Sequence, residues 1–378
     1  MRRCVVIREQ IRKNARVVRR LAGGALVYGV LKADGYGMSL EPMAQTLAAE
    51  GIERFAVTEP EDAVRLAELG LPVREILLLK PVGRESCAAL LRYGAIAFSV
   101  GSPEDAVTLA REGLRQGIRP RVHIQIDTGL GRYGFRWDEP SRVQFLYKSF
   151  KVLDFAGIYT HFAGTGRQAK RQYSRFCRIL DSLKAEGIDP GLRHCAASSA
   201  LLRHPEMVLD AVRIGSAFLG RVAGGADAGL SNACRYEATL ETVRSLRPGD
   251  TVGYGARFRV RRKMRIAAAD IGTLHGLGMR TAEGKQCLSA AAAEIAGKVR
   301  KLFRGADLRA EIGGVSVPVL GRICTECVLL DVTDVDCGPG DLAVFSVNPM
   351  AGRLVESVWL PAEDGGEAPP LMTDTPVA

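Results

Sequence analysis

The sequence lacks the features that mark membrane-spanning and secreted proteins. No apolar run in its 378 residues approaches the roughly 18 residues that a membrane helix needs. The arginine-rich N-terminus has no apolar signal core, and a strand at Cys4–Ile7 followed by an amphipathic helix describes it better. Nine cysteines are too few for a disulfide scaffold and are odd in number. We therefore expect reduced thiols and a cytoplasmic protein that does not contact a membrane.

Motifs for nucleic-acid recognition and clusters of metal ligands are also missing. The net charge of +10 is densest at 257–265, where the first five residues alternate as in a strand with one solvated face. No recognition-helix or RNP pattern accompanies this run, so we expect no nucleic-acid partner. A basic surface would instead attract anionic small molecules, such as a phosphorylated cofactor. Cys324 and Cys327 form a single C-x-x-C pair, which we interpret as strand packing rather than a metal site.

What is present begins with an internal repeat. The segment Phe55–Gly70 recurs as Phe98–Gly113, 43 residues further on. Each copy is an apolar strand followed by a helical pattern with proline in its first turn, acidic residues beside it and glycine at its end. Each copy is therefore predicted to be one β-α unit, with room for another unit between them.

Apolar runs in this register predict eight strands before residue 220, at 25–32, 54–58, 75–80, 95–100, 121–127, 155–162, 194–199 and 211–218. Helical patterns lie between most of them, so we expect an α/β fold with a (β/α)8 TIM barrel. After the glycine-rich stretch at 220–229 the pattern changes to short strands and turns. We therefore expect a barrel at 1–228, a mainly-β domain at 229–362 with one helix around Ala290–Phe303, and a flexible tail at 363–378.

Lys32 ends an apolar, β-prone run, and a glycine-rich turn that contains Tyr36 follows it. An ammonium group at the end of a buried strand is costly to desolvate, which lowers its pKa and leaves a nucleophilic amine. Such an amine can hold an aldehyde cofactor as a Schiff base. A strand-end lysine can equally extend to solvent, so this stretch alone leaves both interpretations open.

Other candidate residues follow later strands. The segment Asp127–Gly134 contains a formal G-x-G-x-x-G, but it follows the fifth strand and has an arginine inside the loop, so we do not expect a dinucleotide site there. That arginine, Arg132, suits a bidentate grip on a carboxylate. His161 closes the sixth strand, where a structural role is also open. The Gly215-Ser216 turn after the eighth strand offers backbone N–H groups to a phosphate. Tyr254 stands between two glycines that shield its phenol little. A tyrosine that is simply packed in a strand would fit this sequence pattern equally well.

Together these segments resemble the alanine racemase family. The motifs that carry the resemblance are Lys32-Ala-Asp-Gly-Tyr36-Gly, Asp127-Thr-Gly-Leu-Gly-Arg132, Tyr159-Thr-His161-Phe, Arg213-Ile-Gly215 and Tyr254-Gly-Ala, in that order. The resemblance implies a barrel with a C-terminal β domain, pyridoxal 5'-phosphate as cofactor, a small amino acid as substrate, and a homodimer with shared active sites.

The resemblance also implies a role for each residue. Lys32 would hold the cofactor and move the proton on one face of the substrate, and Tyr254 from the second subunit would be the base on the opposite face. A racemase needs two bases because the Cα proton leaves one side and returns on the other. Arg132 and the Thr325 backbone would bind the substrate carboxylate. The remaining cofactor contacts would come from Tyr36, His161, Ser198, Arg213, Gly215 and Ser216.

Several positions depart from the family pattern, and they concentrate on the substrate side. Gln125 stands where many members have a lysine, Ala197 where an asparagine is usual, and Thr273 where a tyrosine lines the entrance. Two hypotheses follow: an active racemase of alanine or another small amino acid such as serine, or a homologue that binds the cofactor as a carrier or regulator. The two retained bases favour the racemase, since a binder would not need Tyr254.

Overall fold

The structure is a computed structural model of the 378-residue chain, and it describes residues 1–256, 258–278, 308–346 and 354–361. The predicted helix around 290–303 and the predicted tail at 363–378 lie outside these residues. The chain divides into two compact units. One unit contains Glu9–Asn232, and the other combines Met1–Arg8 with the chain from Ala233 onward.

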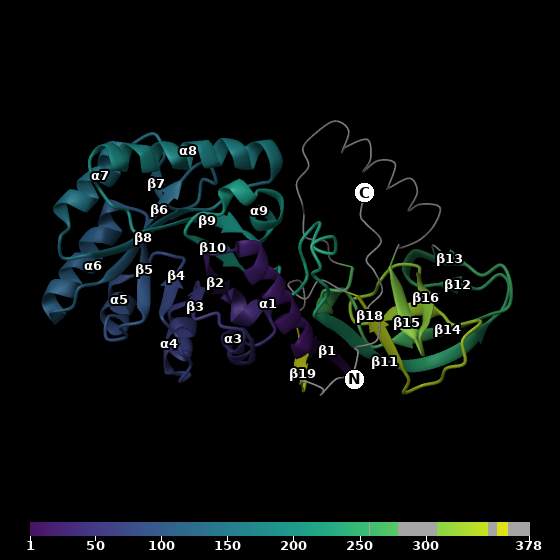
Figure 1. The fold of residues 1–378 in the computed structure, drawn as a ribbon. Coiled ribbons are helices and arrows are strands. Elements are labelled where there is room, and N and C mark those ends of the chain that lie inside the picture. The colour runs from purple at the N-terminus through teal and green to yellow at the C-terminus, as the bar shows by residue number, and fades with distance from the viewer. Residues whose placement is uncertain (257, 279–307, 347–353, 362–378) are drawn as a thin grey trace. The chain divides into compact units, whose positions relative to one another are not determined.

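The first unit is the predicted (β/α)8 barrel (Figure 1). Its sheet runs in the order β5-β4-β3-β2-β10-β9-β8-β6, and an additional pairing between β5 and β6 closes the ring. All of these pairings are parallel. The strands are β2 (Leu26–Val30), β3 (Arg54–Val57), β4 (Glu75–Leu78), β5 (Ile96–Val100), β6 (Arg121–Asp127), β8 (Asp154–Thr160), β9 (Leu192–Ala197) and β10 (Ala211–Ile214), and a short β7 (Phe135–Arg136) pairs with β6. Each of the eight predicted strands is therefore confirmed.

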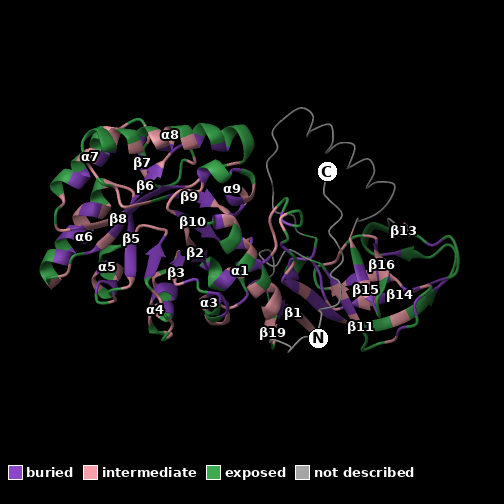
Figure 2. Cartoon of the chain, in the orientation of Figure 1, coloured by how far each residue is buried: buried purple, intermediate pink, exposed green. Residues whose placement is uncertain are grey.

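Helices surround the barrel strands, and each buries one side and exposes the other (Figure 2). They are α1 (Arg8–Ala22), α2 (Lys32–Tyr36), α3 (Leu40–Ala49), α4 (Pro60–Glu68), α5 (Arg84–Leu90), α6 (Pro103–Gln116), α7 (Pro140–Ser149), α8 (Gly166–Ala185) and α9 (Ser198–Arg203), with a short 3-10 turn η1 (Pro205–Met207) after α9. Within the described residues, no helix combines the length and the apolar character needed to cross a bilayer.

The internal repeat corresponds to β3–α4 and β5–α6, as predicted. Pro60 and Pro103 lie at the starts of their helices, where a missing N–H costs nothing. The expected stop of α6 at Gly113 is wrong. The helix continues to Gln116 and ends at Gly117, which has the left-handed φ of 66°. Gly113 is needed for packing instead, because a Cβ there would come within 2.7 Å of both Ile118 O and Pro120 Cδ.

The second unit is a mainly-β domain. Its sheet order is β14-β17-β16-β15-β18-β11-β1-β19, with a further pairing between β14 and β11. The strands are β1 (Arg2–Ile7), β11 (Cys234–Leu246), β14 (Met264–Ala269), β15 (Arg309–Ile312), β16 (Val315–Leu320), β17 (Val328–Asp331), β18 (Leu342–Phe345) and β19 (Glu356–Leu360). A separate hairpin joins β12 (Thr251–Val252) to β13 (Phe258–Arg259), and 3-10 turns form η2 (Tyr254–Ala256) and η3 (Thr273–His275).

The N-terminal strand differs from the predicted domain boundaries. We expected residues 1–8 in the barrel, but β1 pairs antiparallel with β11, where Cys4 faces Tyr236, and parallel with β19. The strand itself was predicted correctly. Its partners were not, because they lie more than two hundred residues away along the chain. The units divide at Asn232/Ala233, four residues after the expected boundary at 228/229.

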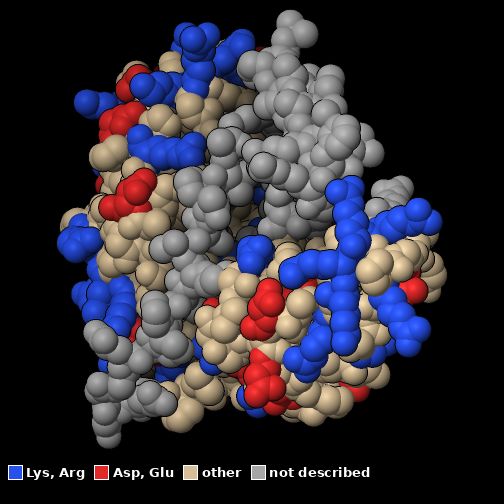
Figure 3. Space-filling view, turned by 90° about the vertical axis from the view of Figure 1, so that its right-hand side faces the viewer, with Lys and Arg blue, Asp and Glu red and all other residues tan. Residues whose placement is uncertain are grey.

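The basic run and the cysteine pair both lie in the second unit. Figure 3 looks onto the side where β12–β14 lie and shows a gathering of Lys and Arg there. Arg259, Arg261, Arg262 and Lys263 are all exposed. Cys324 and Cys327 do not lie in a strand, which corrects our interpretation. They bracket a turn before β17 in which Cys324 N donates to Cys327 O over 3.0 Å.

Candidate active site

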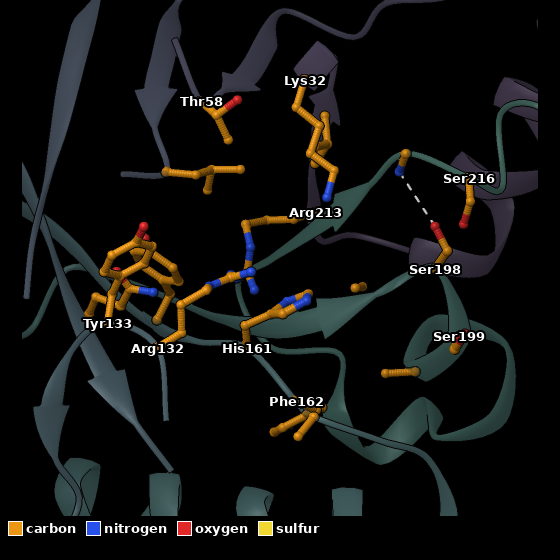
Figure 4. A pocket seen from close by; sticks show the side chains of 18 of the residues that line it. Lys32, Thr58, Arg132, Tyr133, His161, Phe162, Ser198, Ser199, Arg213 and Ser216 are labelled. Carbon is orange, nitrogen blue, oxygen red and sulfur yellow. Dashed lines mark hydrogen bonds between the residues drawn. The ribbon is translucent and has the colours of Figure 1, made fainter. Parts of the chain in front are cut away.

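A cavity of about 400 Å³ opens at the carboxyl ends of the barrel strands (Figure 4). This volume is in the range that small-molecule and cofactor sites occupy. Barrel strands end on one face, which brings together residues that are far apart in the sequence. The cavity is lined by every barrel residue that we singled out for cofactor or substrate, namely Lys32, Tyr36, Arg132, His161, Ser198, Arg213, Gly215 and Ser216.

Lys32 reaches this cavity directly from the end of β2. Leu31 before it is fully buried, so the Lys32 amine emerges from the packed interior. Burial lowers the pKa of Lys32, and the guanidinium of Arg132 lowers it further. Both effects favour the neutral, nucleophilic amine. Lys32 as a whole is exposed to solvent, yet it lines the cavity with an amine of lowered pKa, which is the arrangement that the reactive interpretation requires.

The turn after Lys32 is left-handed. Ala33, Asp34 and Tyr36 have φ of 53°, 52° and 61°, and Gly35 between them has 66°. Such a run costs about 1–2 kcal/mol for each non-glycine residue, so neighbouring contacts must hold it. Asp34 Oδ1 accepts from Leu40 N at 3.0 Å and from Arg65 at 3.1 Å, and these two bonds anchor the turn.

The left-handed turn brings Tyr36 back to the cavity, with its ring centroid 5.8 Å from Lys32 Nζ. The Tyr36 phenol lies against Gly215, so that a Cβ on Gly215 would overlap the phenol oxygen and ring. Burial raises the pKa of Tyr36, so the phenol keeps its proton and can donate it in a hydrogen bond. Ser198 Oγ accepts from Gly215 N at 3.4 Å and from Ala217 N at 3.3 Å. A phenol, hydroxyls and backbone N–H groups thus gather at the turn after β10.

Positive charge dominates the cavity. Lys32, Lys80, Arg132 and Arg213 line it, while no Asp or Glu is among its lining residues in the described part of the chain. His161 lies among these cations, and burial together with the charges of Arg213, Arg132 and Lys32 lowers the pKa of His161 to about 3. The imidazole is therefore neutral at neutral pH. A site with several cations and no carboxylate is suited to an anionic ligand.

Arg213 is the most deeply buried of these cations. Its guanidinium donates to His194 Nδ1 at 2.8 Å, to His194 O at 3.1 Å and to Thr160 O at 2.6 Å. The guanidinium carbon lies 4.8 Å from the centroid of the Tyr159 ring. Burial lowers the pKa of Arg213, but an arginine remains a donor in proteins. Within the described residues, no carboxylate forms an ion pair with it.

Two other residues of β6 and its loop behave differently from the cavity cations. Asp127, the last residue of β6, does not line the cavity. Its carboxylate accepts from the N–H groups of Gly129, Leu130 and Gly131 at 2.8–3.1 Å, which fixes the loop that presents Arg132. Gln125 does line the cavity, is 2% exposed, and has an Oε1 without a hydrogen-bond partner in the structure. A buried acceptor without a partner is costly unless a ligand completes it.

Tyr254 and Thr325, the other predicted site residues, belong to the β domain. Tyr254 is 71% exposed in η2, so its phenol is available to a ligand or to another chain. Thr325 is exposed in the turn before β17. Gly253 lies close to the Thr325 segment, since a Cβ on Gly253 would come within 3.7 Å of Arg322 N. The β domain therefore presents both predicted residues from neighbouring loops.

Sequence reasoning missed several residues that line the cavity: Thr58, Lys80, Tyr133, Phe162 and Thr165. Thr58 and Lys80 follow β3 and β4 closely, so the strand-end rule that found Lys32 would also have found them. Lys80 differs from Lys32, because its ammonium is paired with Glu59 at 2.5 Å. Of the two lysines in the cavity, Lys32 is thus the one without a carboxylate partner among the described residues.

Comparison with known proteins finds matches over both parts of the chain. Residues 6–222 match the alanine racemase N-terminal domain, and residues 233–354 match the alanine racemase C-terminal domain. An alanine racemase from Carboxydothermus hydrogenoformans is 31% identical over 347 residues, which cover 89% of this chain and 87% of that protein. One from Desulforamulus reducens is 32% identical over 335 residues, covering 86% and 84%.

Solved structures give the same fold. The alanine racemase from Streptomyces coelicolor superposes with a TM-score of 0.80 at 23% sequence identity, over 95% of this chain and 98% of that one. The biosynthetic alanine racemase from Pseudomonas aeruginosa gives a TM-score of 0.78 at 21% identity. With both domains matched, this chain belongs to the alanine racemase family and is an amino-acid racemase.

Proposed function

We propose that the protein interconverts the L and D enantiomers of a small amino acid, alanine first and serine second, with pyridoxal 5'-phosphate as its cofactor. The observation that carries the proposal is the Lys32 amine, whose pKa is lowered, in a cavity that three further cations and no carboxylate of the described residues line. Such a cavity favours a ligand with a phosphate and an aldehyde, and then a substrate with a carboxylate.

The residues of the cavity fit this cofactor. Tyr36, Ser198 and the N–H groups of the Gly215-Ser216 turn would hold the phosphate, and Gly215 leaves the space that a side chain would fill. Arg213 would donate to the ring nitrogen, and His161 would lie beside the ring as a neutral group. When bound, the cofactor supplies an aldehyde for the Lys32 amine and a ring that withdraws electrons from the substrate Cα.

The chain supplies the two bases that inversion requires. Lys32 Nζ would take or return the Cα proton on one face, and its lowered pKa suits this exchange at neutral pH. Tyr254 Oη would do the same on the other face. Arg132 would orient the substrate through its carboxylate, with the Thr325 N–H as a second donor.

We further propose that Tyr254 reaches the site from the second subunit of a homodimer, so that each active site needs both protomers. Its 71% exposure supports this assignment, because a phenol that serves another chain must be accessible. A homologue that only binds the cofactor is the less favoured alternative, since the chain retains the cavity amine of Lys32 and the exposed phenol of Tyr254 in the family positions.

The experiment pairs Lys32→Ala with Lys80→Ala. Both lysines line the cavity, but Lys80 is already paired with Glu59. The wild type and Lys80→Ala are expected to bind pyridoxal phosphate with a visible absorption band, and Lys32→Ala is expected to lose the band. Chiral chromatography over the twenty amino acids then identifies the substrate. A wild type that stays colourless with added cofactor would refute the cofactor, and a coloured protein that racemises nothing would refute the enzyme.

A further inference from the structure

A chain of buried polar side chains leads from Arg213 across the inside of the barrel. His194 Nδ1 accepts from Arg213 at 2.8 Å, and His194 Nε2 lies 2.9 Å from His123 Nδ1. His123 Nε2 lies 3.1 Å from Glu75 Oε1, and Arg121 donates to Glu75 Oε2 at 2.6 Å. His194, His123 and Glu75 are at most 1% exposed. Polar groups so deep in a barrel must satisfy one another, because water does not reach them.

The direction of every bond in this chain is fixed by its first donor. Arginine has no acceptor, so His194 Nδ1 carries no proton and His194 Nε2 must carry one. That N–H then donates to His123 Nδ1, which leaves the second proton of His123 on Nε2, where it donates to Glu75. An imidazolium at His123 would place two N–H groups against each other. Both histidines are therefore neutral Nε2–H tautomers as long as Arg213 donates.

Glu75 closes the chain as an anion. Burial alone would raise the pKa of Glu75, but hydrogen bonds from His123, Tyr28 and Arg121 outweigh it and lower the pKa below its usual value. Tyr28 donates to the same carboxylate, and its ring stacks on His194 with the centroids 5.5 Å apart. Tyr159 also stacks on His194, at 5.0 Å. The two phenol rings hold the His194 imidazole in one plane.

We propose that Glu75, His123 and His194 are positioning residues that hold Arg213 as an oriented donor toward the cofactor ring, although none of the three lines the cavity. Arg213 is a buried cation with no carboxylate of its own among the described residues, which is an unstable arrangement unless its surroundings are polarised. The two imidazoles transmit the negative charge of Glu75 toward it as aligned N–H dipoles. The tautomers follow from hydrogen bonds within the protein and do not depend on a cofactor, whereas the effect on the cofactor rests on the proposed function.

The first test needs no cofactor. Long-range ¹H–¹⁵N spectra of the histidine-labelled, ligand-free protein are expected to show His123 and His194 as single Nε2–H tautomers. Glu75→Gln removes the terminal charge and is expected to turn these signals into tautomer mixtures. The matched control is Glu112→Gln, because Glu112 is likewise buried and is bound to two arginines, Arg84 at 3.0 Å and Arg115 at 2.7 Å, but has no hydrogen bond to a histidine among the described residues. An Nδ1–H tautomer at His194 in the wild type, or His194 signals that Glu75→Gln leaves unchanged, would overturn the proposal.

The second test measures the consequence for the site. Glu75→Gln is expected to weaken pyridoxal phosphate binding about ten-fold and to shift the absorption maximum of the bound cofactor, since one charge-assisted hydrogen bond loses its orientation. His123→Gln is expected to act in the same direction, and Glu112→Gln is expected to stay within about two-fold of wild type. Unchanged binding and an unchanged spectrum in Glu75→Gln would refute the positioning role. If the wild type bound no cofactor, the proposed function would fail. The tautomer spectra would still decide whether the hydrogen-bonded network of Glu75, His123, His194 and Arg213 exists.

Discussion

The Tyr36 phenol packs directly against the backbone of Gly215, closely enough that no side chain fits at position 215. These two residues come from the first and last strands of the barrel, β2 and β10, which are paired in the sheet. The contact joins the left-handed turn after Lys32 to the turn that offers N–H groups beside Ser198. The contact between Tyr36 and Gly215 thus holds together the two turns that line this part of the cavity.

This contact predicts the effect of Gly215→Ala. The added methyl group would displace Tyr36 and disturb the proposed phosphate contacts, so we expect pyridoxal phosphate binding to weaken at least about ten-fold, in line with the loss of one strong hydrogen bond. Spectrophotometric titration of the ligand-free protein measures this. The control is Gly24→Ala, because a Cβ on Gly24 meets nothing within 4 Å and its φ is not in the left-handed region. Equal affinities for the two variants would mean that Tyr36 and Gly215 do not hold the phosphate.

A second prediction concerns the two faces of the substrate. Removing the Tyr254 hydroxyl in Tyr254→Phe takes away one base and leaves Lys32, so racemisation is expected to fall by about 10²–10⁴. Since enantiomers have equal free energies, kcat/KM must fall equally in both directions. The asymmetry appears instead in the exchange of the Cα hydrogen with deuterated solvent, which Lys32 can still catalyse for one enantiomer.

The measurement is proton NMR of L- and D-alanine in deuterium oxide with each variant. Tyr93→Phe serves as the control, because Tyr93 lies outside the cavity and bonds to Glu68 at 2.7 Å. Exchange that falls by the same factor for both enantiomers, or that does not fall at all, would show that Tyr254 is not the base for a single face.

The sequence predicted the barrel well because hydrophobic runs and helix-start prolines are local signals. The repeat at Phe55 and Phe98 identified β-α units, and the strand-end rule then brought residues as distant as Lys32 and Ser216 into one cavity. Several of the residues that line the cavity could thus be predicted without coordinates. The pairing of β1 with β11 could not, because a six-residue strand carries no signal about a partner more than two hundred residues away.

Two features inside the site also escaped prediction, for different reasons. The left-handed turn includes Ala33 and Tyr36, residue types that rarely adopt positive φ, so local preference pointed away from it. The Glu75–His123–His194 chain joins three separate strands, and each residue alone reads as an unremarkable polar position. The available signal was that each of the three is a polar residue followed directly by apolar residues of its strand, Ile76, Ile124 and Cys195. That pattern identifies a polar barrel interior, although not its hydrogen bonds.

A third prediction addresses Gln125, which departs from the family pattern. No hydrogen bond joins it to Arg132 in the described structure, and its Oε1 lacks a partner. Gln125→Lys would bring another cation into a cavity that already holds Arg132 and Lys32. Like-charge repulsion is expected to displace the Arg132 guanidinium and to raise KM several-fold, with a smaller change in kcat. Gln125→Met, which has similar size and no charge, separates the charge effect from packing. If Gln125→Lys and Gln125→Met changed KM equally, or if neither changed KM for any accepted amino acid, coupling through Arg132 would be contradicted.

The last prediction follows from the lowered pKa of His161, which burial and the charges of Arg213, Arg132 and Lys32 bring to about 3. The unfolded chain binds this proton near pH 6.5, the usual value for histidine, and the folded chain does not. Between these two pH values the unfolded state therefore holds more protons, so the free energy of unfolding falls as pH falls from about 6.5 toward 3. His161→Asn removes this contribution. Urea unfolding of the ligand-free protein at a series of pH values should show a wild-type slope that is steeper than that of His161→Asn, by at most about 1.4 kcal/mol per pH unit. Parallel slopes for the two proteins would mean that His161 takes up its proton in the folded state, and a neutral imidazole among the three cations would then be the wrong description of the site.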